Sequence, residues 1–256
     1  MIDTHAHVHD AKFDADRAAV IDRAHSAEVT TMITVGCDVA DSFRALECAR
    51  EYRIYSSVGI HPHEAKDAPP DIPSVFEIFL RDPRVVAIGE AGLDYYYDHS
   101  PRDVQRRVLR EQLVLAREAG FPFIFHQRDA FDDFLAILRD HWEQPMRGVV
   151  HCFTGDAAQA QTLTDEFGLY LGIGGVLTFK TAEALREAVR AVGLRSLVLE
   201  TDCPYLAPIP HRGERNEPAY VTLTAARLAE VLDRGVDEVV SVTDANARNL
   251  FSLKAD

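Results

Sequence analysis

Runs of apolar and β-branched residues recur eight times along the chain, and a helical hydrophobic pattern follows each run. Nearly continuous apolar runs are typical of strands buried on both faces, as in a parallel sheet covered by helices. The runs occupy residues 1–7, 30–36, 54–60, 84–90, 122–126, 148–151, 168–174 and 196–202. Because right-handed strand–helix units repeated eight times close into a barrel, the pattern predicts an α/β fold, a single (β/α)8 TIM barrel.

The helical patterns lie between and after these runs, at about residues 13–28, 41–52, 72–80, 101–119, 131–141, 159–167, 181–192, 218–233 and 243–253. The chain has 256 residues, close to the roughly 250 of a typical barrel, and shows no linker or low-complexity stretch. We therefore expect one domain over residues 1–256. The alternative, a doubly wound open sheet, usually has a glycine-rich phosphate loop after its first strand, where this chain has His5 and His7.

The charge and the cysteines restrict the class of protein. A formal net charge of −14 disfavours a protein that coats nucleic acid or a membrane surface, because such proteins have basic patches. Bound divalent ions nevertheless reverse the potential locally. The four cysteines have no C-x-x-C spacing and are typical of reduced thiols. No secretory leader and no apolar run near 18 residues is apparent, so we expect a cytoplasmic protein without a membrane partner. We also expect a monomer.

Side chains of the metal-ligand type stand at the ends of six predicted strands. They are His5 with His7, His61 with His63, Glu90, His126, His151 and Asp202. In a TIM barrel the carboxyl ends of the strands surround the active site. One histidine at a strand end is commonly a structural residue, but equivalent positions on six strands indicate a shared metal site.

The number of these donors favours two divalent ions, because one ion takes about four ligands. The expected metal ligands are His5, His7, Glu90, His126, His151 and Asp202. Glu90 has two oxygens with which to bridge the ions. Ions about 3.5–4 Å apart stabilise an in-line displacement and generate hydroxide from water near neutral pH. Asp202 is then the expected catalytic proton acceptor, with one oxygen on a metal and the other on the attacking water.

Three further residues are candidates for binding a phosphate. His63 shares a face with His61, and the pair either contacts a phosphate, holds a third ion or is a structural loop pair. We expect His61 to act in catalysis and His63 in substrate binding. Arg128 suits bidentate phosphate binding but equally an ion pair with a carboxylate. Arg215, on a later loop, either binds substrate or lies on a solvated face.

Three consecutive tyrosines at positions 95–97 follow the fourth predicted strand. Their rings are suited to stacking on unpaired bases. Packing beneath the rim of the barrel is the equal alternative.

Taken together, seven motifs resemble the TatD family of metal-dependent deoxyribonucleases, within the amidohydrolase superfamily. They are IDTHAH at 2–7, GIHPH at 59–63, GEAGLD at 89–94, HQRDA at 126–130, HCFTG at 151–155, ETDCPYL at 200–206 and RGERNEP at 212–218. The resemblance implies a TIM barrel, divalent metals on the same six ligands, and 3′→5′ hydrolysis of phosphodiesters in single-stranded DNA and sometimes RNA. Gln127 and Cys203 depart from the usual family residues, neither at a ligand position.

The leading hypothesis is therefore a divalent-metal-dependent nuclease, a 3′–5′ exonuclease on single-stranded DNA or on RNA. The alternative is an amidohydrolase or esterase for small molecules or aminoacyl-tRNA, since the same metal site serves attack on a carbonyl. A binding protein with a residual metal is a third hypothesis. The sequence leaves magnesium, manganese and zinc open as the ions.

Overall fold

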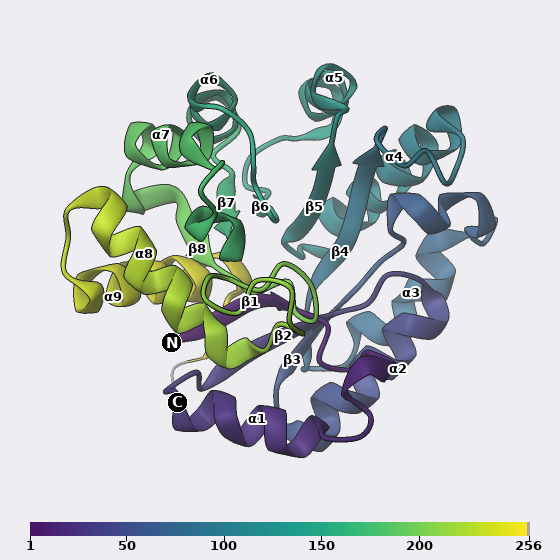
Figure 1. Cartoon of the computed structure of the whole chain (residues 1–256). Coiled ribbons are helices and arrows are strands. Elements are labelled where there is room, and N and C mark those ends of the chain that lie inside the picture. Colours follow the sequence, from purple (N-terminus) through teal and green to yellow (C-terminus); the bar gives the residue numbers. More distant parts are fainter. Residues whose placement is uncertain (255–256) are drawn as a thin grey trace. The chain divides into compact units, whose positions relative to one another are not determined.

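The computed structural model describes residues 1–254, in which eight parallel strands belong to one sheet ordered β1 to β8. The strands are β1 (Ile2–Ala6), β2 (Thr31–Val35), β3 (Tyr55–Val58), β4 (Val85–Asp94), β5 (Phe123–Arg128), β6 (Gly148–Val150), β7 (Tyr170–Ile173) and β8 (Leu197–Leu199). Between and after them lie α1 (Arg17–Ser26), α2 (Val39–Tyr52), α3 (Ile72–Leu80), α4 (Arg102–Ala119), α5 (Phe131–His141), α6 (Ala157–Gln161), α7 (Glu183–Val192), α8 (Val221–Leu232) and α9 (Val236–Phe251) (Figure 1). This alternation confirms the predicted α/β class and (β/α)8 topology.

Contacts along the chain divide it into two compact units. The first unit contains residues 1–34 together with the chain from Cys152 onward, and the second contains residues 35–151. The interpretation of residues 1–256 as one domain stays a prediction.

The first unit joins the start of the chain to its last strands. β8 pairs with β7 in the register Leu171 to Leu197, and β1 pairs with β2 in the register Ile2 to Thr31. Past the ends of β1 and β8, the Asp202 amide donates to the His5 carbonyl at 2.8 Å. The helices α8 and α9 pack on each other and on β8 (Figure 1). The two chain segments that carry predicted ligands in this unit are therefore bonded directly through their backbones.

The second unit is built on β3 to β6. Its register sets Ile88 opposite Phe123 and Gly92 opposite His126. α4 packs on β4 through a buried apolar face that includes Val108 and Leu113 (Figure 1). This packing supports β4, which pairs with β5 up to the carboxyl ends of both strands.

Several predicted boundaries differ from the structure. β4, expected to end at residue 90, continues to Asp94. α9 begins at Val236 instead of residue 243, with Asp237 and Glu238 in its first turn, where acidic side chains are favourable. The helical segment predicted at 159–167 is a short α6 that continues as a π-helical turn over Thr162–Glu166. β8 ends at Leu199, so Asp202 lies on the loop after the strand.

The described helices were also compared with the requirements of a membrane span. None of those within residues 1–254 has both the length and the apolar character needed to cross a bilayer.

Candidate metal centre

In the first unit, His5, His7 and Asp202 lie together past the ends of β1 and β8. The Nε2 atoms of His5 and His7 lie 3.9 and 3.5 Å from Asp202 Oδ1. The two imidazole centroids are 5.1 Å apart. Asp202 has a φ of +57°, a left-handed conformation that is strained for a residue with a side chain and is common at functional sites. The structure thus brings together three predicted ligands from opposite ends of the sequence.

Asp3 holds these two segments in place. Its Oδ1 accepts hydrogen bonds from the Thr201 amide at 2.9 Å and the His5 amide at 3.3 Å. Its Oδ2 accepts from the Thr201 hydroxyl at 2.6 Å. Burial raises the pKa of Asp3 to about 7, against the opposite effect of these hydrogen bonds. Because His5 and the neighbour of Asp202 are both bound, Asp3 fixes the separation of the two ligand segments.

In the second unit, the carboxylate of Glu90 lies among three imidazoles. Glu90 Oε1 is 2.7 Å from His126 Nδ1, 2.9 Å from His151 Nε2 and 3.4 Å from His61 Nε2. Burial by itself raises the pKa of Glu90, but the surrounding imidazoles outweigh burial and hold the pKa well below its ordinary value. Glu90 is therefore an anionic carboxylate at neutral pH.

The donor set around Glu90 fits a divalent cation. One ligand atom each from His61, Glu90 and His126 lies within 4.8 Å of the others. Imidazole nitrogen with carboxylate oxygen is a combination that suits zinc, manganese or iron. The sequence analysis assigned Glu90 and His126 as metal ligands and His61 to catalysis, with a third ion as one alternative for the His61–His63 pair. The structure places His61 beside Glu90 and His126.

Two glycines allow β4 and β5 to approach closely enough to form this group. Gly89 has a φ of +125°, and a Cβ there would meet the Ile124 carbonyl oxygen at 2.3 Å. A Cβ on Gly92 would lie 1.8 Å from the carbonyl oxygen of His126. No side chain fits at either position, so the sequence around Glu90 is required for the approach of His126.

Asp94 is a site residue that the sequence analysis missed. Its Oδ2 accepts hydrogen bonds from His63 Nε2 at 2.9 Å and from His126 Nε2 at 3.2 Å. Burial raises the pKa of Asp94, but the bonds from His126 and His63 outweigh it and lower the pKa well below the ordinary range. Carboxylates in this position orient metal-binding histidines. The predicted strand ended at residue 90, whereas β4 continues to Asp94, and residues 90, 92 and 94 of a strand point to the same face.

His126 and His61 respond differently to these carboxylates. Burial lowers the pKa of His126, but its hydrogen bonds to Asp94 and Glu90 outweigh burial and raise it. Burial dominates at His61 and lowers its pKa to about 4, despite the nearby Glu90. His63 lies beside His61, with ring centroids 4.4 Å apart, and donates to Asp94.

The two arginines expected to bind substrate lie in different surroundings. The guanidinium of Arg128 stacks over the rings of Tyr96 and Tyr97, 4.0 and 4.9 Å from their centroids. Arg215 donates to both carboxylate oxygens of Asp16, at 2.8 and 2.7 Å, and to Glu217 at 3.0 Å. Substrate binding by either arginine stays a prediction.

With this geometry established, known proteins were compared with the chain. The family model described as TatD related DNase matches residues 2–252. The chain belongs to the TatD family. The fold agrees, since a crystal structure of YjjV, a TatD homolog from Escherichia coli K12, superposes with a TM-score of 0.93 at 31% identity, covering 99% of this chain and 98% of that one.

Two relatives match over nearly their whole length. The chain is 41% identical to the uncharacterized metal-dependent hydrolase YabD of Bacillus subtilis (strain 168), over 99% of each chain. It is 38% identical, also over 99% of each, to a protein of Salmonella typhimurium named 3′-5′ ssDNA/RNA exonuclease TatD. The resemblance drawn from the motifs is confirmed, and the chain is a metal-dependent hydrolase of this family.

Proposed function

We propose that the chain is a divalent-metal-dependent nuclease that degrades single-stranded DNA or RNA from the 3′ end. The buried carboxylate of Glu90, with three imidazole nitrogens within 3.4 Å, carries the proposal. Full-length similarity to a relative named as an exonuclease supports the choice of substrate. The acidic net charge of −14 agrees with contact to a few nucleotides and disagrees with broad binding to a duplex.

The ligands that we propose for two divalent ions are His5, His7, Glu90, His126, His151 and Asp202. Their support is the order of the motifs along the chain and the donor chemistry of the clusters within each unit. His61 joins the group around Glu90 as a further ligand or as a contact to the phosphate. Magnesium, manganese and zinc are the candidate ions.

The bound ions supply Lewis-acid stabilisation of the phosphoryl oxygens and acidify a water molecule. Of the chain's own residues, Asp202 would accept the proton of the attacking water at one of its carboxylate oxygens. Glu90 remains anionic and offers two oxygens. Arg128 and His63 hold the phosphate backbone, and Asp94 keeps the rings of His63 and His126 in orientation.

We place this nuclease in the cytoplasm as a monomer. No disulfide joins the cysteines at positions 37, 48, 152 and 203 within the described chain, which suits a reducing compartment. Sedimentation of the purified protein tests the monomer.

The function is tested by cleavage of a 3′-labelled single-stranded oligonucleotide. Metal-stripped protein receives magnesium, manganese or zinc, beside a His126→Ala variant treated in the same way. We expect metal-dependent release of labelled mononucleotides by the wild type and none by the variant. A folded wild-type protein that releases nothing with any of the ions, but hydrolyses amides, esters or aminoacyl-tRNA, would establish the alternative function.

A further inference from the structure

Two tyrosines on the turn after β4 are unusually exposed for their size. Tyr96 and Tyr97 retain 57% and 49% of their accessible surface. The turn is rigid at the backbone, because Asp94 Oδ1 accepts hydrogen bonds from the amides of Tyr96 at 3.0 Å and Tyr97 at 2.9 Å. The rings meet edge to face, with centroids 4.8 Å apart. His99 already stacks on Tyr97, with centroids 5.3 Å apart, so Tyr96, the more exposed of the two, offers the open ring of this fixed pair to another flat ring.

The guanidinium of Arg128 completes this surface. It stacks on Tyr96 and Tyr97, and within residues 1–254 its side chain has neither an ion pair nor a hydrogen bond to a protein group. Stacking occupies the flat face of the guanidinium and leaves the N–H donors at its edge. Those donors match the oxygens of a phosphate in a bidentate contact.

The tyrosines lie close to the group around Glu90. The ring centroid of His63 is 5.4 Å from that of Tyr97 and 4.4 Å from that of His61, whose Nε2 faces Glu90. His63 and His61 therefore form a continuous line of rings from Tyr97 to the carboxylate of Glu90. Asp94 bonds both His126 and the amides of the tyrosine turn, so the turn is fixed relative to a metal ligand.

We propose that Tyr96, Tyr97 and Arg128 form a nucleobase-stacking subsite for the nucleotide next to the cleaved phosphate. The inference rests on the proposed nuclease function. It adds a set of contacts through which a protein of acidic net charge binds a single strand. The rings stack on the unpaired base whatever its sequence, and Arg128 binds the adjoining phosphate.

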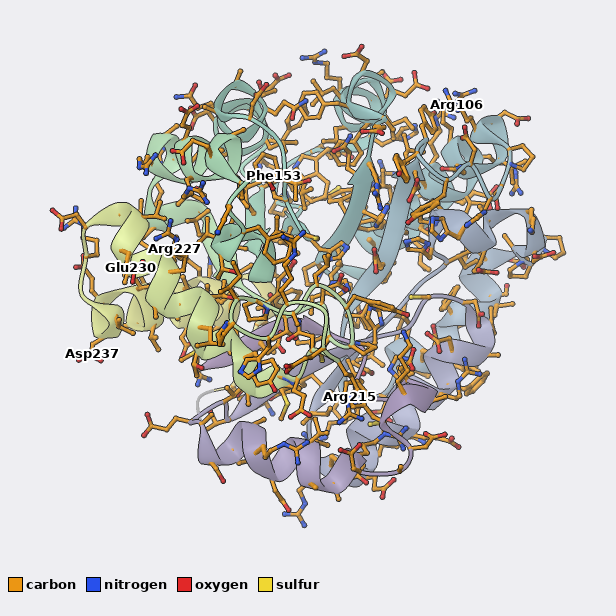
Figure 2. The ribbon with its side chains drawn as sticks, in the orientation of Figure 1. Arg106, Phe153, Arg215, Arg227, Glu230 and Asp237 are labelled. Atoms are coloured by element: carbon orange, nitrogen blue, oxygen red, sulfur yellow. The ribbon has the colours of Figure 1, made fainter. Side chains whose placement is uncertain are left out.

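Tyr95, the first tyrosine of the run, has a different role. Its hydroxyl donates to Asp133 at 2.6 Å and accepts from Arg106 at 3.0 Å, and Arg102 stacks on its ring at 4.2 Å (Arg106 is labelled in Figure 2). These contacts bind the turn to α4 and α5. We therefore exclude Tyr95 from the subsite.

Binding of a non-cleavable oligonucleotide tests the subsite separately from turnover. Metal-loaded protein is titrated into a fluorescein-labelled phosphorothioate oligothymidylate, and anisotropy gives the Kd. The variants are Tyr96→Ala/Tyr97→Ala and the matched Tyr96→Phe/Tyr97→Phe, which keeps both rings. From the energy of base stacking we expect the alanine pair to raise the Kd roughly 5- to 150-fold and the phenylalanine pair to leave it unchanged.

The outcomes for the two proposals are distinguishable. An unchanged Kd in a folded alanine variant overturns the subsite, and so does an equal loss in the phenylalanine pair. If the wild type cleaves no phosphodiester, the nuclease function fails, but the Kd values still decide whether the tyrosines bind nucleic acid.

Discussion

Two arginines with the same predicted role, Arg128 and Arg215, lie in regions of opposite chemistry. Around Arg128 the neighbours are exposed aromatic rings, and its N–H donors meet no protein acceptor within residues 1–254. Arg215 also lies over an aromatic ring, that of Phe13 at 4.7 Å, but two carboxylates, Asp16 and Glu217, accept hydrogen bonds from its guanidinium (Arg215 is labelled in Figure 2). A cation whose donors are satisfied stabilises the fold, whereas one held in place by stacking keeps its donors for a ligand.

The region of Arg215 shows what such a network stabilises. Arg23 on α1 donates twice to Glu217, at 2.8 Å each, and so ties α1 to the segment before α8. The adjacent Asn216 donates to the carbonyls of Thr201 at 2.8 Å and Tyr205 at 2.6 Å. The network therefore supports the loop that carries Asp202.

The largest predicted effect concerns the chemistry that both regions serve. We expect Glu90→Gln to abolish metal-dependent turnover, with a loss beyond the roughly 10–100-fold typical of an outer-shell partner. The neutral amide of glutamine lacks the negative charge by which the Glu90 carboxylate attracts a divalent cation. Turnover and bound metal per protein are measured together, with the exposed Glu77→Gln as the matched control. Full activity in Glu90→Gln would exclude this group from the reaction.

A smaller effect is expected from the substitution Asp94→Asn. The native carboxylate of Asp94 binds both His126 and the amides of Tyr96 and Tyr97. Because the variant weakens the orientation of His126, we expect metal affinity to fall roughly 10–100-fold. Competition with a chelating dye measures the affinity, and circular dichroism checks the fold. Unchanged affinity in a folded protein would limit Asp94 to a structural role.

The comparison of the two arginines predicts that one substitution mainly changes KM and the other mainly changes stability. Arg128→Ala is expected to raise the KM for an oligonucleotide about tenfold, the order of a lost charge-assisted hydrogen bond, with no change in Tm. Arg215→Ala is expected to lower the free energy of unfolding by about 1–2 kcal/mol, with a smaller change in KM. Equal effects of both variants on KM and Tm would remove the distinction between the regions.

The smallest expected effect is the pH dependence of the Arg215 network. The hydrogen bond from Arg215 lowers the pKa of Asp16 to about 2, against an ordinary value of 3.8. A depressed pKa stabilises the fold above the ordinary value, and this contribution is lost as the pH falls from about 4 to 2. We expect the Tm difference between wild type and Asp16→Asn to shrink over that range. A constant difference would show that the charge of Asp16 contributes nothing.

Local periodicity was sufficient for most of the fold. The predicted helices at 72–80 and 131–141 have the observed bounds, because their apolar spacing is helical and Asp71 caps the first. The start of α9 was missed, since its first turns are acidic and β-branched. The ligand types at the strand ends were visible because a parallel fold gathers those ends.

Partnerships between distant residues were not predictable from one sequence. Arg215 and Asp16 are 199 positions apart, and of the two carboxylates that accept from Arg215 only Glu217 is near it in the sequence. The role of Asp94 depends likewise on His126, a residue of the next strand. The sequence also does not distinguish Tyr95 from the two exposed tyrosines that follow it. Tyr95 is held by contacts with Asp133, Arg106 and Arg102, all distant in the sequence or on the next helix.

The salt dependence of oligothymidylate binding tests most directly whether Arg128 contacts a phosphate of the bound nucleic acid. Log Kd is measured against log salt for metal-loaded wild type, Arg128→Ala and Arg215→Ala, with the non-cleavable oligonucleotide. We predict that Arg128→Ala lowers the magnitude of the slope by about 0.7, the contribution of one phosphate on a single strand, and that Arg215→Ala retains the wild-type slope. A reduced slope for Arg215→Ala with an unchanged slope for Arg128→Ala would contradict the account.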